Sequence, residues 1–250
     1  MDQKMLLEAC VDSVESAIAA QRGGADRLEL CSNLIIGGTT PGIALYQEVK
    51  KNVSIPIHAL IRPRFGDFLY SDYEFSIMCH DIEALKHSGA QGIVIGMLKQ
   101  DGTLDLPRMK ELMHYADGMS VTLHRAFDMS VNLRESLYEA IELGISTILT
   151  SGGEESATHG LEILRELQGE AAGRIQIMAG AGVNAESIVK LHKLAGIHTF
   201  HMSGKTVLES GMVYRNDRIN MGLPGISEYE IWQTLEIQIR SARNVLDQLQ

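Results

Sequence analysis

The stretch AAQRGGADRLELC (residues 19–31) places the end of a helix directly before a strand, and this order decides the fold. Glycine ends helices because it adopts the left-handed backbone conformation without steric cost. Here it separates a helical run from the apolar run RLELC. The same order recurs before the strands expected at Gly92–Met97, Thr147–Thr150 and Thr199–Met202. A repeated helix–strand unit is therefore predicted.

Further apolar runs of strand length lie between these units, at Met5–Cys10, Ile57–Arg62, Met119–Arg125 and Arg174–Gly180. Strands that alternate with helices pair in parallel through right-handed crossovers, and eight such units in 250 residues are typical of a closed (β/α)8 barrel. The alternative is an open, doubly wound sheet, which normally has a glycine-rich first turn. The first turn, CVDS at residues 10–13, has no glycine. We therefore predict an α/β fold, a single TIM-barrel domain over residues 1–250.

The C-terminal part of the chain departs from this repeat. Residues 204–226 contain four glycines and Pro224 and are predicted to form a loop. Ser227 is expected to cap a helix that runs to about Leu249, with Glu230 completing a capping box. This added C-terminal helix would pack on the barrel wall or on a second subunit.

Composition limits the possible partners. The formal net charge is −10 and no basic stripe occurs, which argues against binding to nucleic acid or to an anionic membrane surface. No apolar run reaches the roughly 18 residues of a membrane span, and the N-terminus lacks the basic-then-apolar layout of a signal peptide. The three cysteines are an odd and sparse set, which suggests reduced thiols. We expect a cytoplasmic protein.

Polar residues alternate with apolar ones in four of the predicted strands, although strands buried on both faces should be apolar throughout. The polar members are Glu8, Cys10, Glu29, Cys31, His124, His201 and Ser203. We expect the apolar set to face the helices and the polar set to point into the barrel at its C-terminal mouth, where barrel active sites are built. The alternative is a hydrogen-bonded polar layer with a structural role. Because four strands converge on one mouth, we favour a functional site.

Two cysteines are the predicted metal ligands. Cys10 and Cys31 end adjacent strands, each two residues after a glutamate, so their thiols should meet. Two thiolates suit Cu(I), which prefers soft sulfur ligands. Zinc would normally need four ligands, to which His124 or His201 could contribute. The alternative is that each cysteine is a small buried hydrophobe.

The candidates for acid–base catalysis are Glu8, Glu29, His124 and Asp128. Two carboxylates inside a barrel should have perturbed pKa values, as a like-charge pair or as partners of arginine. They would act as acid and base, or anchor Arg62 or Arg125 structurally. A histidine is suited to general acid–base work near neutral pH. Asp128 would orient His124 or an arginine, or else cap a helix that begins near Asn132.

Further side chains are candidates for binding an anionic substrate. Arg62 should end the third strand facing the mouth, where its planar guanidinium would bind a carboxylate or phosphate. Arg64 would do the same, or pair with Asp67 in a turn. Many barrels bind phosphate on the glycine-rich loops after the last two strands, and the alternative here is two ordinary turns. The residues predicted for this role, besides these two arginines, are Arg125, Ser151, Gly180, Gly182, His201 and Ser203.

Several segments resemble the CutC copper homeostasis family. They read EACVDSVES (8–16), GGADRLELCS (23–32), GGTTP (37–41), IRPR (61–64), GDFLYS (66–71), HRAFDM (124–129) and LTSG (149–152). The resemblance spans nearly the whole chain and implies a cytoplasmic, usually oligomeric TIM barrel with a role in copper tolerance. It also implies that Cys10 and Cys31 are Cu(I) ligands. The chain departs from the family pattern at Ile36, Phe65 and Ala181, which weakens a phosphate or loop-closure role and leaves the cysteines untouched.

Two functions therefore compete. The first is a copper homeostasis protein that binds Cu(I) through Cys10 and Cys31. The second is an enzyme that acts on a small anionic or phosphorylated metabolite, because Arg62, His124 and the glycine loops exceed what a metal carrier needs. The expected partners are a copper ion or such a metabolite, together with further copies of the chain in a homo-oligomer.

Overall fold

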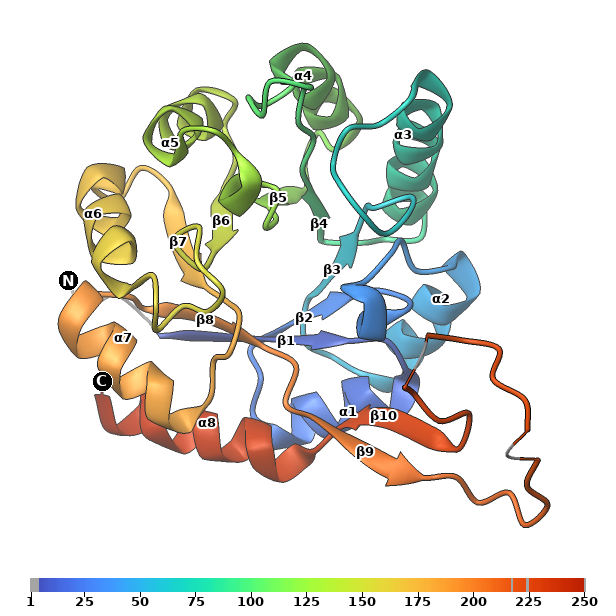
Figure 1. Cartoon of the computed structure of the whole chain (residues 1–250). Helices are drawn as coiled ribbons and strands as arrows, with labels where there is room; N and C mark the ends of the chain where they lie inside the picture. Colours follow the sequence, from blue (N-terminus) through green and yellow to red (C-terminus); the bar gives the residue numbers. More distant parts are fainter. Residues whose placement is uncertain (1–4, 217, 224, 250) are drawn as a thin grey trace.

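The computed structural model describes residues 5–216, 218–223 and 225–249, and in these ranges eight short parallel strands close into a barrel (Figure 1). The strands are β1 (Leu6–Val11), β2 (Arg27–Leu30), β3 (Ile57–Leu60), β4 (Gly92–Ile95), β5 (Ser120–Leu123), β6 (Thr147–Thr150), β7 (Gln176–Ala179) and β8 (Thr199–Met202). The predicted TIM barrel is confirmed. Most strands end one or two residues before the expected boundary, because the chain turns into loops at the mouth.

Helices surround the barrel, and α1 to α7 connect its successive strands (Figure 1). They are α1 (Val14–Gly23), α2 (Ile43–Asn52), α3 (Asp72–His87), α4 (Leu106–Tyr115), α5 (Leu133–Glu142), α6 (Leu161–Ala171), α7 (Ala185–Ala195) and α8 (Glu236–Leu249). Short 3-10 helices, η1 (Leu34–Ile36) and η2 (Phe127–Met129), lie in the loops after β2 and β5. Within the described ranges, no helix is both long enough and apolar enough to cross a membrane.

Glycine ends the helix in the stretch that predicts the fold. Gly24 follows α1 with a φ angle of 95°, and its amide donates to the carbonyl groups of Ala20 and Gln21. The preceding Gly23 has a second role, since a Cβ atom there would lie 2.6 Å from Cβ of Ile239 in α8. The missing side chain therefore allows α8 to pack closely on α1.

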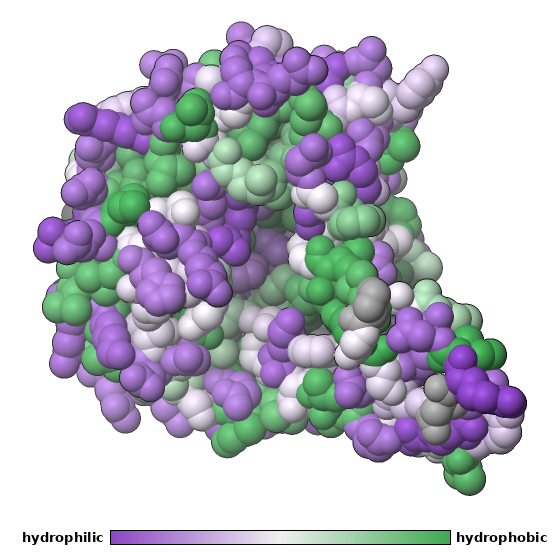
Figure 2. Space-filling view, viewed as in Figure 1, coloured by the Kyte–Doolittle hydropathy of each residue, from purple (hydrophilic) through white to green (hydrophobic). Residues whose placement is uncertain are grey.

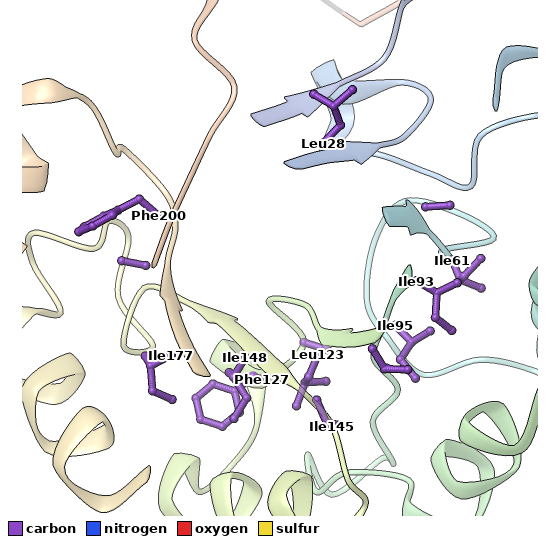
Figure 3. Close-up of a cluster of buried hydrophobic side chains, with 14 of the residues drawn as sticks. Leu28, Ile61, Ile93, Ile95, Leu123, Phe127, Ile145, Ile148, Ile177 and Phe200 are labelled. Carbon is purple, nitrogen blue, oxygen red and sulfur yellow. The ribbon is translucent and has the colours of Figure 1, made fainter. Parts of the chain in front are cut away.

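The apolar side chains of the strands point away from the barrel axis and pack against the helices (Figure 3). Buried members of this outer core include Leu28, Ile93, Leu123, Ile148 and Phe200. Cys10 and Cys31 belong to a separate, smaller apolar cluster with Leu60 and Val94. The prediction that the apolar set faces the helices is confirmed, and the alternate positions are left to face the lumen.

A two-stranded sheet replaces part of the loop predicted for residues 204–226. The strands β9 (Lys205–Glu209) and β10 (Glu230–Thr234) pair antiparallel and extend away from the barrel (Figure 1). Trp232 lies opposite Val207, a pair of residue types that favours strands. Because the pairing joins distant segments, the local glycine signals did not reveal it. Pro224, named in the predicted loop, lies outside the described residues.

The C-terminal helix is present, but its predicted start at Ser227 is wrong. Ser227 Oγ accepts a hydrogen bond from the amide of Tyr229 and so stabilises a turn instead of a helix end. The helix α8 begins at Glu236, after β10, and packs against α1 and α7. The helix was expected to pack on the barrel wall or on a second subunit. It packs on the barrel wall, as the eighth helix of the barrel.

Candidate functional site

A cavity of about 490 Å³ lies at the C-terminal ends of the strands, and Figure 2 shows the hollow near the centre of this face. Its lining brings together the predicted residues Cys10, Glu29, Arg62, His124, Arg125, Gly182, His201 and Ser203. The other predicted residues are placed outside this lining and are Glu8, Cys31, Arg64, Asp128, Ser151 and Gly180. The mouth of the barrel thus gathers a polar group of side chains, as active sites of this fold do.

The two predicted thiol ligands lie in contact. Their Sγ atoms are 3.9 Å apart, and both side chains are buried beside Leu60 and Val94. Cys10 also donates to Glu29 Oε1 at 3.3 Å, because the stagger of β1 and β2 sets these two residues side by side. The hydrogen bond with Cys31, together with burial, raises the pKa of Cys10 well above its usual value. Cys10 is therefore a neutral thiol at physiological pH.

A buried ion pair fixes the wall formed by β1, β2 and β8. Glu8 lies opposite Arg27 on one side and His201 on the other, because β1 closes the barrel against β8. One carboxylate oxygen accepts from Arg27 Nε at 2.5 Å, and the other lies 2.8 Å from His201 Nδ1. Burial opposes ionisation, but Arg27 and then His201 outweigh it and lower the pKa of Glu8 to about 2. Arg27 was not predicted, although it shares the lumen face with Glu29 in RLELC.

Three potential ligand atoms come together beside this ion pair. Cys10, Glu29 and His201 each offer one such atom, and these atoms lie within 4.8 Å of one another. Burial raises the pKa of Glu29, and its Oε2 atom is buried without a hydrogen-bond partner in the described part of the chain. Burial lowers the pKa of His201, but Glu29 and Glu8 outweigh it and raise that pKa above the usual value.

His124 lies on a different part of the mouth and stays neutral. Burial and the nearby charge of Arg62 lower its pKa to about 3, far from the near-neutral value expected from the residue type. Its Nδ1 atom accepts from the amide of Ala126 at 3.1 Å, so the neutral ring carries its proton on Nε2. No acceptor for this N–H group lies among the described residues. The ring fits because Gly96 has no side chain, since a Cβ there would lie 2.4 Å from it.

Arg62 faces the mouth as predicted, but its guanidinium group holds loops in place. Nη1 donates to the carbonyls of Gly37 and Gly38, both at 3.0 Å, and Nη2 donates to the carbonyl of Gly66 at 2.8 Å. The same group stacks on the Phe68 ring at 5.1 Å. Phe68 also lines the cavity and was not predicted. Arg62 therefore joins the loops after β2 and β3 at the rim of the cavity.

Arg64 points to a separate ion-pair cluster outside the cavity lining. It pairs with Asp67 at 2.9 Å and with Glu74 at 2.6 Å. The pairing with Asp67 is one of the two expected arrangements. Its donors are thus engaged on the outer side of the loop.

Asp128 orients an arginine instead of capping a helix. It accepts from Arg125 Nε at 2.7 Å and from the amides of Ser151 and Gly153. The cap of α5 is Asn132, whose side chain accepts from the amide at its third helical position. Asp128 thereby links the loops after β5 and β6 and holds Arg125 at the edge of the cavity.

The loop after β7 presents backbone groups and a neighbouring cation to the cavity. Ala181 and Gly182 both have left-handed backbones, with φ of 68° and 74°, and both line the cavity. The Asn184 side chain caps α7 and so occupies amides at its N-terminus. Ser203 and Lys205 line the cavity beside this loop. Lys205 was missed because its segment was predicted to be a loop.

Comparison with known proteins places the chain in a family. The sequence model of the CutC family matches residues 5–206. A CutC family protein of Bacteroides fragilis is 47% identical over 229 residues, covering 90% of each chain. The human copper homeostasis protein cutC homolog is 43% identical, covering 96% of this chain and 90% of its own length. The crystal structure of a putative copper homeostasis protein CutC from Streptococcus agalactiae matches with a TM-score of 0.76 and 29% identity, covering 80% of this chain and 98% of the other. The chain belongs to the CutC copper homeostasis family.

Proposed function

We propose that this protein binds Cu(I) through Cys10 and Cys31 at the barrel mouth. The observation that carries the proposal is the 3.9 Å distance between the two buried Sγ atoms. A metal–thiolate bond to zinc is about 2.3 Å long, so one ion can contact two sulfurs up to about 4.6 Å apart. Thiolates are the ligands that Cu(I) prefers. Two soft donors at this separation fit a two-coordinate copper ion.

The surroundings of the two sulfurs support the same proposal. Leu34, Leu60 and Val94 pack around them and keep water away. Gly38 lies against Cys31, since a Cβ at this glycine would be 3.2 Å from Cβ of the cysteine. Cys10 lines the cavity, so an ion would enter from its side. A shielded pair of thiols with one open side suits the uptake and release of a soft cargo ion.

The test is a Cu(I) titration without oxygen, read by competition with a coloured Cu(I) chelator. The wild-type chain should take up one tightly bound Cu(I), and the double variant Cys10→Ser/Cys31→Ser should lose it. Cys79→Ser is the matched control, because Cys79 is buried in the outer core on α3 and should not affect uptake. Equal uptake by the double variant and the wild type would contradict the proposal.

We also propose that the protein works in the cytoplasm. The support is that two thiols in contact remain free, as does Cys79. Neighbouring thiols persist in a reducing compartment and tend to oxidise outside it. Fractionation of the source cells should recover the chain with cytoplasmic markers, and recovery with exported proteins would contradict this proposal.

A second candidate function is an enzyme that acts on a small anionic metabolite, and the size of the cavity favours it. The volume of about 490 Å³ far exceeds what one ion needs and lies in the range of small-molecule pockets, about 300–1,000 Å³. Arg125 and Lys205 supply positive charge, and His124 offers an N–H donor. Glu29 lies across the same cavity as a candidate acid or base.

Isothermal titration with inorganic phosphate tests this second function. Binding should weaken at least about tenfold in Lys205→Gln, because a charge-assisted hydrogen bond is worth about 1.5–3 kcal/mol. Arg64→Gln keeps wild-type affinity in this account, since Arg64 lies outside the cavity lining. Absence of phosphate binding in the wild type at millimolar concentrations would contradict an anion site.

We further propose that the chain forms a homo-oligomer through the β9–β10 arm. Large apolar side chains are exposed along this arm and include Val207, Met212, Val213, Tyr214 and Met221. Exposed apolar patches of this kind mark protein interfaces. Light scattering should give a mass above that of one chain, and Val213→Asp with Tyr214→Asp should lower it. A monomeric wild type would contradict the proposal.

A further inference from the structure

We propose that Cys10, Glu29 and His201 form a second metal site, for a divalent ion of the zinc class, with one position open to the cavity. The proposal goes beyond Cu(I) binding, because it uses a carboxylate and an imidazole and does not use Cys31. The three ligand atoms lie within 4.8 Å of one another. Bonds of about 2.0–2.3 Å place ligands about 3.3–3.8 Å apart around a tetrahedral ion, so side-chain movements of about 1–1.5 Å would close the site.

The carboxylate of Glu29 has few hydrogen-bond donors among the described residues. This side chain is only 5% exposed, and its Oε2 atom has no hydrogen-bond partner among the described residues. Among the residues that the structure describes, its Oε1 atom accepts only from the Cys10 thiol, at 3.3 Å, and a thiol is a weak donor. A buried carboxylate normally has several donors or a counterion, because an unsatisfied charge in a low-dielectric interior is costly. A divalent ion bound to Glu29 would balance this charge.

The histidine is held as a ligand would be. His201 Nδ1 lies 2.8 Å from Glu8 Oε1, which leaves Nε2 free. Glu8 is in turn fixed by Arg27 through its other oxygen. Histidines that bind metals commonly donate their second N–H group to a carboxylate, which orients the ring. Glu8 is thus a positioning residue, which acts on the metal through His201.

The charges and the access also fit a divalent ion. One thiolate and one carboxylate neutralise a doubly charged ion, while Glu8 is already balanced by Arg27. Cys10, Glu29 and His201 all line the cavity of about 490 Å³. The fourth position would therefore face a ligand in that cavity, as in zinc sites that polarise a bound molecule. Such a site would give the large cavity a Lewis acid at its wall.

The test uses the metal-free full-length chain under reducing conditions, with Zn²⁺ affinity measured by competition against a chromophoric chelator. We expect one Zn²⁺ per chain, and a loss of affinity of about 100-fold or more in Glu29→Gln and in His201→Gln. Glu8→Gln should weaken binding by about 10–100-fold, the usual effect of losing a group that orients a ligand. His114→Gln is the control and should keep wild-type Zn²⁺ affinity, because His114 is exposed on α4, outside the cavity lining and the ligand group.

Cobalt supplies a readout that needs no variant to fold. Co²⁺ in the wild-type site should give tetrahedral d–d bands and a thiolate-to-metal charge-transfer band, and Cys10→Ser should lose the latter. Cys31→Ser separates the two metal proposals: it should abolish Cu(I) uptake and leave Zn²⁺ affinity unchanged. The zinc site is overturned by a cobalt spectrum without the charge-transfer band, by wild-type Zn²⁺ affinity in both Glu29→Gln and His201→Gln, or by a Cys31→Ser variant that loses Zn²⁺.

Discussion

His201 and His124 both lie at the mouth of the barrel, yet their environments shift their pKa values in opposite directions. His201 is at β8 beside Glu8 and Glu29, and these carboxylates outweigh burial and raise its pKa. His124 follows β5, where burial and Arg62 lower its pKa to about 3. The β1–β2–β8 wall is therefore a network of opposite charges, while the His124 ring is neutral beside the cation of Arg62. The residue type alone does not reveal the direction in which the pKa of a histidine shifts.

The strongest test of this contrast removes the carboxylate at the centre of the charged wall. Glu8→Gln leaves Arg27 buried without its counterion, and we expect the free energy of unfolding to fall by about 3–5 kcal/mol in urea denaturation. The matched control is Arg134→Gln, which breaks an exposed pair with Glu170 and should cost less than about 1 kcal/mol. Equal losses of unfolding free energy in the two variants would show that the buried ion pair contributes no more to stability than an exposed one.

Acid should act next on the two histidines whose pKa values are lowered, which are His124 and His58, a β3 residue that lies opposite Glu29. The unfolded chain protonates its histidines below about pH 6.5, whereas folded His58 and His124 stay neutral down to about 4 and about 3. The contribution of these two neutral histidines to the free energy of unfolding is complete above about pH 6.5. It is lost as the pH falls from about 6.5 towards the folded pKa, by about 1.4 kcal/mol per pH unit for each histidine. His201 has the opposite sign, since its raised pKa contributes stability at low pH that is lost as the pH rises through its folded pKa.

Unfolding measured between pH 8 and pH 5 checks this dependence. The double variant His58→Gln/His124→Gln should have a flatter profile than the wild type. Histidine titration by NMR gives an independent readout, with His201 titrating above His58 and His124. Identical pH profiles for variant and wild type would show that the lowered pKa values of His58 and His124 do not govern the loss of stability in acid.

A smaller effect is expected from filling the space beside His124. In Gly96→Ala the new Cβ would lie 2.4 Å from the imidazole, and such overpacking should cost about 1–3 kcal/mol in thermal or urea unfolding. Gly169→Ala, inside α6 and clear of other atoms, should instead stabilise the chain by about 0.5–1 kcal/mol. If Gly96→Ala leaves the free energy of unfolding unchanged, His124 is not packed as tightly against Gly96 as described.

The smallest effect concerns a charge outside both regions. Arg64→Gln breaks partly exposed pairs with Asp67 and Glu74, and we expect a loss of less than about 1 kcal/mol in urea unfolding. Cu(I) uptake and phosphate binding should stay at wild-type values. A large loss of either binding activity would bring Arg64 into the functional site.

The fold was readable from the sequence because its signals are local. Glycine at the end of α1, followed by the alternation in RLELC, predicts one helix–strand unit, and its recurrence predicts the barrel. The β9–β10 arm was missed, because its strands lie far apart in the chain and pair through contacts such as Trp232 with Val207. The start of α8 was wrong for the same reason.

The members of the site were partly readable, but their interactions were not. Alternation placed Cys10, Glu29 and His201 on the lumen face. The partner of Glu8 depends on the register of β1 with β2 and β8 in the closed barrel. For this reason the sequence did not predict the role of Arg27. The pKa of His124 depends on burial and on Arg62 from the loop after β3. Strand register and burial depend on segments that are distant in the chain, so no local sequence pattern predicts them.

X-ray absorption at the copper edge of the Cu(I)-loaded chain tests the central claim most directly. The account predicts one Cu(I) bound by two sulfur atoms in the wild type, from Cys10 and Cys31, whose Sγ atoms are 3.9 Å apart. Loss of bound copper in Cys31→Ser, with an unchanged two-sulfur environment in Cys79→Ser, would complete the assignment. A copper environment made only of nitrogen and oxygen ligands in the wild type would contradict it.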